Sequence, residues 1–451
     1  METRRTFIKK IFTAFGVLIF GRDVVARETK KHTMKQDIKS TVYRAVNGRP
    51  SENLSKVIDL MGGIERMIGT DDIVIIKPNV QWWNQGVPNL SALKVFVDLI
   101  MNRRNGGFNG EVVLVENCHR GACPREALHS GWAPIFSRNS DLDQINNYND
   151  LGKHLKKKYG DKFSICHLID IDKGSKRVFS PANGSGYVYC DGTGGVPLIS
   201  MDNGAREDDF REVIMTYPIF KTDNGTIIDF KNGIWEKGAY TGQPLKFINF
   251  AALNHHSTYC GATSAIKNYL GISDLSGGPD PFKNGKLTGK YYNFHSFPFN
   301  KWSPGPEPGM IGAEIGMFLK TIRKADLNIT TAEWIGLASR TAPPVARTKA
   351  VLASIDPVAL DFHATKYLLF PNSKIPVHNP DDTLTPLYQY LIKCSEQGGG
   401  VFDEKHVAVK AYDFKTNGFQ GDDELVVIGK KTWGRDLKNL MKYLVLRFYR
   451  N

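Results

Sequence analysis

The densest group of side chains that could carry chemistry lies in residues 253–271, which include the adjacent histidines His255 and His256. Histidine acts as a general base near neutral pH and is the commonest metal ligand. Because adjacent side chains diverge, we expect one of the two histidines, rather than both, to serve as a base or a ligand. The alternative is that they are loop histidines bonded to the backbone.

The second half of this stretch favours a short helix. Thr263 or Ser264 could cap its N-terminus, and Gly271 lies where it would end. Lys267 and Asn268 would then project from its last turns. An ammonium group in this position could bind carboxylate or phosphate oxygens.

Polar side chains also follow five predicted strands. In open α/β sheets, ligands bind outside the carboxyl ends of the strands, so these residues together predict one site for a small anionic or polar ligand. Any one of them alone would more often be a turn residue. The residues are Lys77 and Asn79; Glu116, Asn117, Cys118, His119 and Arg120; Lys221, Thr222 and Asp223; Glu333; and Asp356.

Most of these residues are predicted to be catalytic residues, substrate-binding residues or metal ligands. Lysines supply positive charge, amides and carboxylates orient a ligand or a cation, and histidines move protons. The predicted catalytic residues are Lys221, Lys267, His255 and His256. The predicted substrate-binding residues are Lys77, Asn79, Asn117, Asn268 and Asp356. The predicted metal ligands are Glu333, Asp223 and His119.

The chain has six cysteines, which bear on cofactors and compartment. None forms a C-x-x-C pair or a ferredoxin-type run, so a protein-bound iron–sulfur cluster is not expected. A soft metal ion could be bound by Cys118, His119 and Cys123, but their spacing is not that of a recognised zinc site. An exported protein could oxidise a pair of cysteines, although buried free thiols are the simpler interpretation.

The elements that must position these residues alternate between strand and helix. Residues 72–77 and 111–116 are β-branched runs typical of buried strands, and an amphipathic helix capped by Asn89 or Ser91 lies between them, ending at Met101. This spacing predicts a parallel βαβ unit and a mixed α/β fold. Further strands are predicted at 163–171, 212–220, 326–331 and 350–354, helices at 140–160, 311–325 and 361–369, turns or a short hairpin at 180–205, and a long loop at 273–310.

The N-terminal sequence predicts an export signal; the alternative is a basic amphipathic helix that only touches a membrane. Arg4 and Arg5 follow a threonine and precede an apolar pair and a lysine, which is the order that the twin-arginine translocase recognises. The apolar run that follows, at 11–20, is about 10 residues long, which suits a signal peptide and is too short to span a membrane. We therefore expect residues 1–30 to be signal and linker. The protein would be periplasmic, or anchored in the inner membrane if the signal is not cleaved.

Composition narrows the partners. The chain of 451 residues carries a formal net charge of +13 and is 41% hydrophobic, which predicts a folded protein. The charge favours anionic partners, although a solvated basic surface is the simpler interpretation. Nucleic acid fits poorly with export, and the sequence has no motif for binding it. Residues 27–50 are polar and basic and predict a linker, followed by a single domain at 50–430. Residues 431–451 predict a basic amphipathic helix that packs on the domain or, less favourably, contacts a membrane surface.

Four ordered blocks resemble the bacterial and archaeal family called domain of unknown function 362. The resemblance implies a Rossmann-like α/β fold, with an open, mostly parallel sheet, helices on both faces and long loop insertions, but no settled reaction. Asp223 stands where the family usually has histidine, so His255 or His256 could replace that group. The blocks are Lys77-Pro78-Asn79, the strand and lysine at 214–222, Thr-x-x-Ile-Lys-Asn-x-x-Gly at 263–271, and Ala-Ser-x-Asp-Pro-Val-Ala-x-Asp at 353–361.

Three functions follow as hypotheses. The first is an exported enzyme that acts on a small anionic substrate, by redox or epimerase-type chemistry, with a metal or organic cofactor of unspecified identity. Twin-arginine export favours proteins that load a cofactor before translocation. The resemblance extends distantly to the N-terminal half of lactate racemase-type nickel-cofactor enzymes. The second hypothesis is a non-catalytic binding protein for an anionic ligand, and the third is a basic protein that coats membranes.

Overall fold

The computed structural model describes residues 37–104, 106–116, 130–132, 136–168, 176–202, 212–256, 260–274 and 309–433. From Lys39 onward these residues belong to one compact unit. The predicted signal at 1–30, most of the predicted loop at 273–310 and most of the C-terminal helix predicted at 431–451 lie outside the described residues. Within the described ranges, no helix is both long and apolar enough to cross a membrane.

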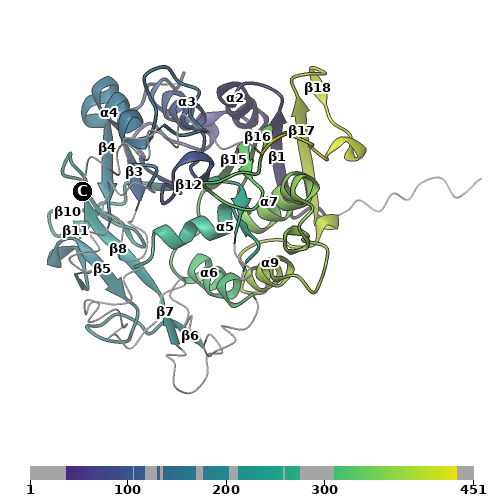
Figure 1. Ribbon diagram of the computed structural model, residues 1–451. Coiled ribbons are helices and arrows are strands. Elements are labelled where there is room, and N and C mark those ends of the chain that lie inside the picture. The colour runs from purple at the N-terminus through teal and green to yellow at the C-terminus, as the bar shows by residue number, and fades with distance from the viewer. Residues whose placement is uncertain are drawn as a thin grey trace, which may run out of the picture. The chain divides into compact units, whose positions relative to one another are not determined.

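A ten-stranded mixed sheet, mostly parallel, forms the centre of this unit, and the predicted α/β class is confirmed (Figure 1). Its order is β18-β17-β1-β16-β15-β12-β2-β3-β4, with β19 paired to β16. The five strands from β15 to β4 are parallel to their neighbours in that half. The strands are β1 (Ser40–Val46), β2 (Ile73–Pro78), β3 (Glu111–Glu116), β4 (Phe163–His167), β12 (Leu245–Ala252), β15 (Leu327–Gly336), β16 (Val345–Ser354), β17 (Val407–Asp413), β18 (Gly418–Phe419) and β19 (Lys430–Thr432).

Helices cover both faces of the sheet. Ile73 and Ile75 of β2 pack into one apolar core, whereas the alternating Val74 and Ile76 pack into another, because successive side chains of a strand point to opposite faces. The second core is closed by α2 (Pro50–Leu60), α3 (Leu90–Met101) and α4 (Tyr148–Tyr159). The first is closed by α5 (Ala265–Asn268), α6 (Met310–Thr321), α7 (Pro357–Ala364) and α9 (Pro386–Glu396).

Several predicted elements are confirmed, and several strands were not anticipated, among them β1 and β12 of the main sheet. The N-cap of α3 is Asn89, whose side chain accepts a hydrogen bond from the Ala92 amide at 3.0 Å. The prediction that residues 27–50 form only a linker is wrong, because residues 40–46 form β1 between β16 and β17. Strand β12, for which the sequence analysis made no prediction, lies between β2 and β15.

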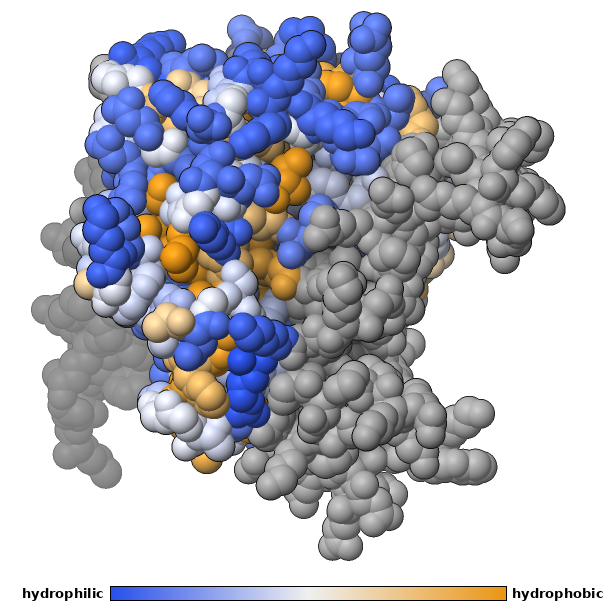
Figure 2. Space-filling model, turned by 90° about the vertical axis from the view of Figure 1, so that its left-hand side faces the viewer, coloured by the Kyte–Doolittle hydropathy of each residue, from blue (hydrophilic) through white to orange (hydrophobic). Residues whose placement is uncertain are grey.

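A second sheet of five short strands, in the order β11-β10-β9-β8-β5, packs beside the main sheet. The strand predicted at 212–220 is divided at Met215, and its second part belongs to this smaller sheet. Figure 2, which faces this side of the molecule, shows hydrophilic side chains over much of the surface with apolar areas between them. The five strands are β5 (Gly186–Tyr189), β8 (Thr216–Lys221), β9 (Ile227–Asp229), β10 (Gly233–Glu236) and β11 (Ala239–Tyr240). Two separate pairs are formed by β6 (Ser200–Asp202) with β7 (Glu212–Ile214) and by β13 (Asn254–His255) with β14 (Ala262–Thr263).

Candidate functional site

The sheet reverses its order of connection between β2 and β12. From β2 the chain passes through α3 to β3 and through α4 to β4, moving outward on one side. Strand β12 lies on the other side of β2, and the chain leaves it through α5 and α6, on the opposite face, to reach β15. In open α/β sheets such a switch point opens a crevice at the carboxyl ends of the two strands, where ligands bind.

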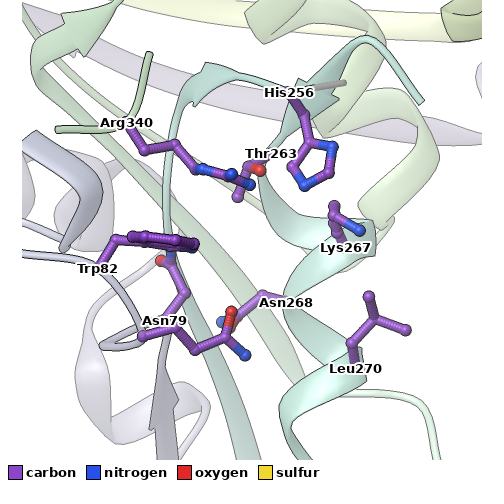
Figure 3. A pocket seen from close by; sticks show the side chains of 9 residues that line it. Asn79, Trp82, His256, Thr263, Lys267, Asn268, Leu270 and Arg340 are labelled. Atoms are coloured by element: carbon purple, nitrogen blue, oxygen red, sulfur yellow. The ribbon is translucent and has the colours of Figure 1, made fainter. Parts of the chain in front are cut away.

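A pocket of about 370 Å³, including its open mouth, lies at this switch point. Asn79 comes directly after β2, and His256 follows the short extension of β12. Figure 3 shows Trp82 and Arg340 on one side of the pocket and Lys267, Asn268 and Leu270 on the other. The lining residues are Asn79, Gln81, Trp82, His256, Thr263, Lys267, Asn268, Leu270 and Arg340.

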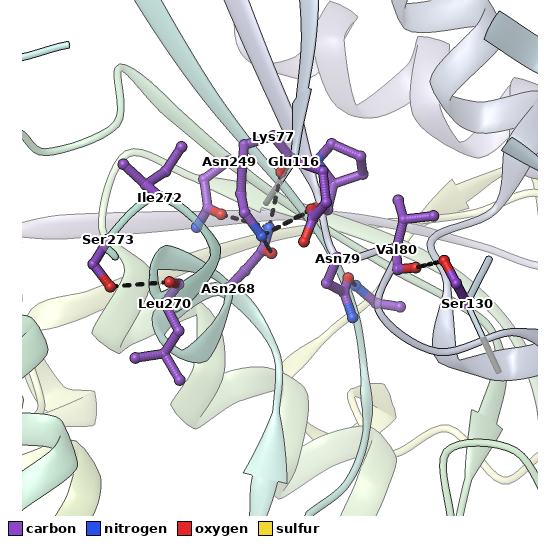
Figure 4. Close-up of polar contacts among 12 residues, drawn as sticks. Lys77, Asn79, Val80, Glu116, Ser130, Asn249, Asn268, Leu270, Ile272 and Ser273 are labelled. Atoms are coloured by element: carbon purple, nitrogen blue, oxygen red, sulfur yellow. Dashed lines mark hydrogen bonds and ion pairs between the residues drawn. The ribbon is translucent and has the colours of Figure 1, made fainter. Parts of the chain in front are cut away.

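The floor of the pocket is a buried polar network around Lys77 (Figure 4). The Lys77 ammonium group lies 3.1 Å from a carboxylate oxygen of Glu116 and donates to the Asn268 side-chain oxygen and to the Pro78 carbonyl at 3.0 Å. The Asn268 amide donates in return to the Lys77 carbonyl at 2.9 Å and to the Asn249 side chain at 2.7 Å. Lys77 therefore fixes Asn268 from beneath and is itself fully buried.

Burial dominates the electrostatics of this floor. It raises the pKa of Glu116 to about 7, against the opposing influence of the Lys77 ammonium group. It also lowers the pKa of Lys77, with Glu116 acting in the other direction. Gly271 packs directly on the pair, since a Cβ there would lie 2.3 Å from Lys77 Nζ. The glycine of the block at 263–271 thus has a packing reason, and the Lys77 pair supports the pocket rather than lining it.

Helix α5 is held in place by a carboxylate from another helix. Ser264 is its N-cap residue but makes no side-chain capping bond. Instead, Asp361 of α7 accepts hydrogen bonds from the amides of Ala265 and Ile266 at 2.8 and 2.9 Å. Burial raises the pKa of Asp361 to about 7. Sequence reasoning did not select Asp361 as a site residue, although the last family-like block ends on it.

Lys267 and Arg340 bring positive charge to opposite walls. Lys267 is 7% exposed and lines the pocket from α5, as the sequence predicted. Arg340 comes from the loop between β15 and β16 and lies over the Trp82 ring, 4.7 Å from its centre. The sequence analysis missed both Arg340 and Trp82, because neither belongs to a recognisable motif.

The adjacent histidines diverge, as expected. His256 lines the pocket, and its Nδ1 atom lies 3.2 Å from the Cys260 sulfur. His255 Nδ1 instead lies 2.9 Å from Nε2 of His378, whose Nδ1 is 2.7 Å from the Ser373 hydroxyl. Burial lowers the pKa of His255, and it lowers that of His378 to about 3, so this pair is neutral at neutral pH. His256 is the histidine placed to meet a ligand.

The structure does not bring Lys221 and Asp223 to this pocket. The hydroxyl of Thr222, between them, donates to Glu111, the first residue of β3. Glu116 ends the same strand five residues later, about 17 Å away at the usual strand rise. Lys221 and Asp223 are both exposed, and neither lines the pocket. The prediction that they join Lys77 is therefore wrong, because their strand belongs to the smaller sheet.

The remaining predicted residues have structural partners or lie outside the described residues. Asp356 caps α7 by accepting from the Val358 and Ala359 amides, and its other oxygen accepts from the Val401 amide at 2.8 Å. It does not line the pocket. Asn117 and His119 fall in the part of the chain that the structure does not describe.

Two of the three predicted metal ligands, Glu333 and Asp223, belong to the described residues, and these two do not converge. Glu333 accepts a hydrogen bond from Arg347 Nε at 2.7 Å, and burial raises the pKa of Glu333. Asp223 is exposed beside Thr222, at the amino end of β3. Among the described residues, no three histidine, cysteine or acidic side chains gather as metal ligands would.

Comparisons of this chain with protein-family models, curated proteins and solved structures found no match.

Proposed function

We propose that this chain is an exported enzyme that binds a small anionic substrate in the pocket between β2 and β12. The observation that carries the proposal is the meeting of Lys267, Arg340 and His256 at the switch point of the sheet. Clefts of this kind, with few convergent polar groups, are the usual ligand sites of α/β proteins. The twin arginines Arg4 and Arg5 supply the reason to propose export.

The pocket residues suit acid–base chemistry on an acid. A guanidinium and an ammonium group would hold the anionic oxygens. His256 would transfer a proton to or from the neighbouring carbon, as an epimerisation requires. Trp82 and Leu270 add apolar surface for the rest of the substrate. Asn79 is committed to the scaffold, because its side chain bonds the Gly86 carbonyl at 3.0 Å and the Ala252 amide at 2.8 Å.

Binding and catalysis can be tested separately. Calorimetric titration of the purified protein at low salt with acetate and with inorganic phosphate should detect binding of at least one anion. Lys267→Ala should abolish that binding, whereas Lys320→Ala, which changes an exposed lysine of α6, should not. Binding of neither anion, or equal loss in both variants, would remove the basis of the proposal.

Catalysis requires a second measurement. Proton NMR of small acids incubated with the protein in D₂O should show exchange of a carbon-bound hydrogen for at least one acid. His256→Gln should stop this exchange while leaving anion binding within about threefold, because the amide keeps a polar group of similar size. Exchange that persists in His256→Gln would assign the proton transfer to another residue.

One observation favours a non-catalytic binding protein as the second candidate. If the buried Cys260 thiol donates to Nδ1 of His256, the proton of the neutral ring is on Nε2, which would then donate to a bound anion. His256 would serve as a binding group and not as a base. Anion binding without hydrogen exchange in any acid tested would favour this function over the enzyme.

We also propose that the chain belongs to the family called domain of unknown function 362 and that it binds a cofactor before export. The support is the blocks at 77–79 and 263–271, which meet in this pocket. Metal analysis and a visible spectrum of protein purified from its native host would test the cofactor. Metal-free protein without visible absorption would contradict it.

A further inference from the structure

Among the described residues, the buried Thr263 hydroxyl has no hydrogen-bonding partner. Thr263 ends β14, lines the pocket and is 7% exposed. Its Oγ1 makes no hydrogen bond within the described part of the chain. A buried hydroxyl left in this state is unfavourable, so such groups in a pocket usually meet a ligand or water. The sequence analysis considered Thr263 only as a helix cap, a role that Asp361 fills instead.

Three donors reach the pocket from three separate elements. Thr263 comes from the β13–β14 hairpin, Lys267 from α5, and Arg340 from the loop between β15 and β16. Figure 3 shows Arg340 and Lys267 on opposite sides, with Thr263 between Arg340 and His256. Donors in such different directions suit an acceptor with several oxygens that are not in one plane.

We propose that the pocket binds a phosphate group, free or as a small phosphate ester, with Thr263, Lys267 and Arg340 as its donors. This inference rests on the proposed anion pocket and names its ligand class. A phosphate monoester presents three terminal oxygens in a tripod, whereas a carboxylate presents two in a plane. Its charge near −2 at neutral pH also matches an ammonium and a guanidinium group better than a monoanion does.

The other walls limit what carries the phosphate. Arg340 lies over the Trp82 ring, which orients its guanidinium plane. Trp82 and Leu270 leave an apolar surface beside the donors. The space of about 370 Å³ between the walls includes open solvent, so the enclosed part is smaller and the bound compound must be small.

The test compares anions and Thr263 variants by calorimetric titration of the full folded chain at low salt. The probes are inorganic phosphate, glycerol 2-phosphate and acetate. We expect phosphate or its ester to bind at least tenfold more tightly than acetate. Tighter binding of the ester than of inorganic phosphate identifies a phosphate ester as the ligand, and the reverse identifies free phosphate; both support the inference.

Thr263→Val, which keeps the shape and removes the hydroxyl, should weaken phosphate binding about tenfold or more. Thr263→Ser, which keeps the hydroxyl, should stay within about threefold of the native protein. Thr383→Val removes an exposed hydroxyl and should have no effect. Thr263→Ala replaces the valine variant if circular dichroism shows that valine prevents folding.

Two results overturn the inference. The first is that acetate binds as tightly as phosphate and that Lys267→Ala abolishes its binding. The proposed anion pocket would then remain supported, but not its preference for phosphate. The second is unchanged phosphate affinity in a folded Thr263→Val or Thr263→Ala variant. Failure of every anion to bind would instead overturn the proposed function as well.

Discussion

Replacing Gly271 with alanine should damage the floor of the pocket. A Cβ at this position would lie 2.3 Å from Lys77 Nζ, 2.4 Å from Lys77 Cε and 3.0 Å from Glu116 Oε1. Carbon atoms in favourable contact are about 3.5–4.0 Å apart, so either the chain at Gly271 or the Lys77 side chain must move by roughly an ångström. The Lys77 side chain cannot yield alone, because it also bonds Asn268.

The size of the effect follows from what is displaced. An extra methyl group in a well-packed core costs about 1–3 kcal/mol. Removing one partner of a buried ion pair costs about 3–5 kcal/mol, since the other charge is left without compensation, and this range bounds the cost of pushing the two partners apart. Partial relaxation of Lys77 and Glu116 places the expected loss near 3 kcal/mol, which is about a hundredfold in the folding equilibrium. Because Lys77 supports Asn268, anion affinity should fall as well.

Urea unfolding followed by tryptophan fluorescence measures the loss, and anion titration measures its effect on the pocket. Gly421→Ala is the matched control, because Gly421 has a φ of −76° and no atom within 4 Å of a Cβ built there. A Gly271→Ala protein whose free energy of unfolding matches that of Gly421→Ala would refute the close packing on the Lys77–Glu116 pair.

Three further predictions follow from the placement of individual side chains. Lys221→Ala should leave anion affinity unchanged in calorimetric titration; a loss comparable to that of Lys267→Ala would contradict its position outside the pocket. Asp361→Ala leaves two buried amides of α5 without an acceptor, so it should lower the free energy of unfolding by about 2–4 kcal/mol and weaken anion binding. Unchanged stability in urea unfolding would contradict the role of Asp361 in holding α5. Burial lowers the pKa of His378 from 6.5 to about 3. As the pH falls below 6.5, His378 therefore takes up a proton in the unfolded chain but not in the folded chain. The free energy of unfolding then drops by up to about 1.4 kcal/mol per pH unit until pH 3. His378→Asn should therefore lose about 2 kcal/mol less than the native protein between pH 6.5 and 5, and parallel stability curves would contradict this.

Local signals were sufficient for the elements around the pocket. The β-branched runs of β2 and β3 identified two strands, and Asn89 marked the start of the helix between them. Asn79, Lys267 and Asn268 were predicted at one site, and all three line the pocket. Each depends on a strand end or a helix cap that lies within a few residues of it, so short-range reasoning could place it.

Strand β1 shows where local reasoning stops. Its seven residues look like linker because Arg44 sits among them in a polar, basic stretch. In the fold, Arg44 is fully buried and donates to the Leu425 carbonyl and the Gln420 side chain, both at 2.6 Å. These acceptors lie more than 370 residues away along the chain. Burying an arginine is costly unless most of its donors have partners, and no residue near Arg44 in the sequence indicates these two partners.

The prediction that Lys221 joins the site was wrong for a different reason. A strand was predicted at 212–220, and its second part is β8. The rule that ligands bind at the carboxyl ends of strands was also sound. The rule holds only for strands of one parallel sheet, and β8 pairs with β5 and β9 in an antiparallel sheet of its own. Glu111 then ties the turn after Lys221 to the amino end of β3, the end remote from Glu116. Sheet membership is set by pairing between distant segments, so a polar residue at a predicted strand end becomes evidence for a site only once its sheet is known.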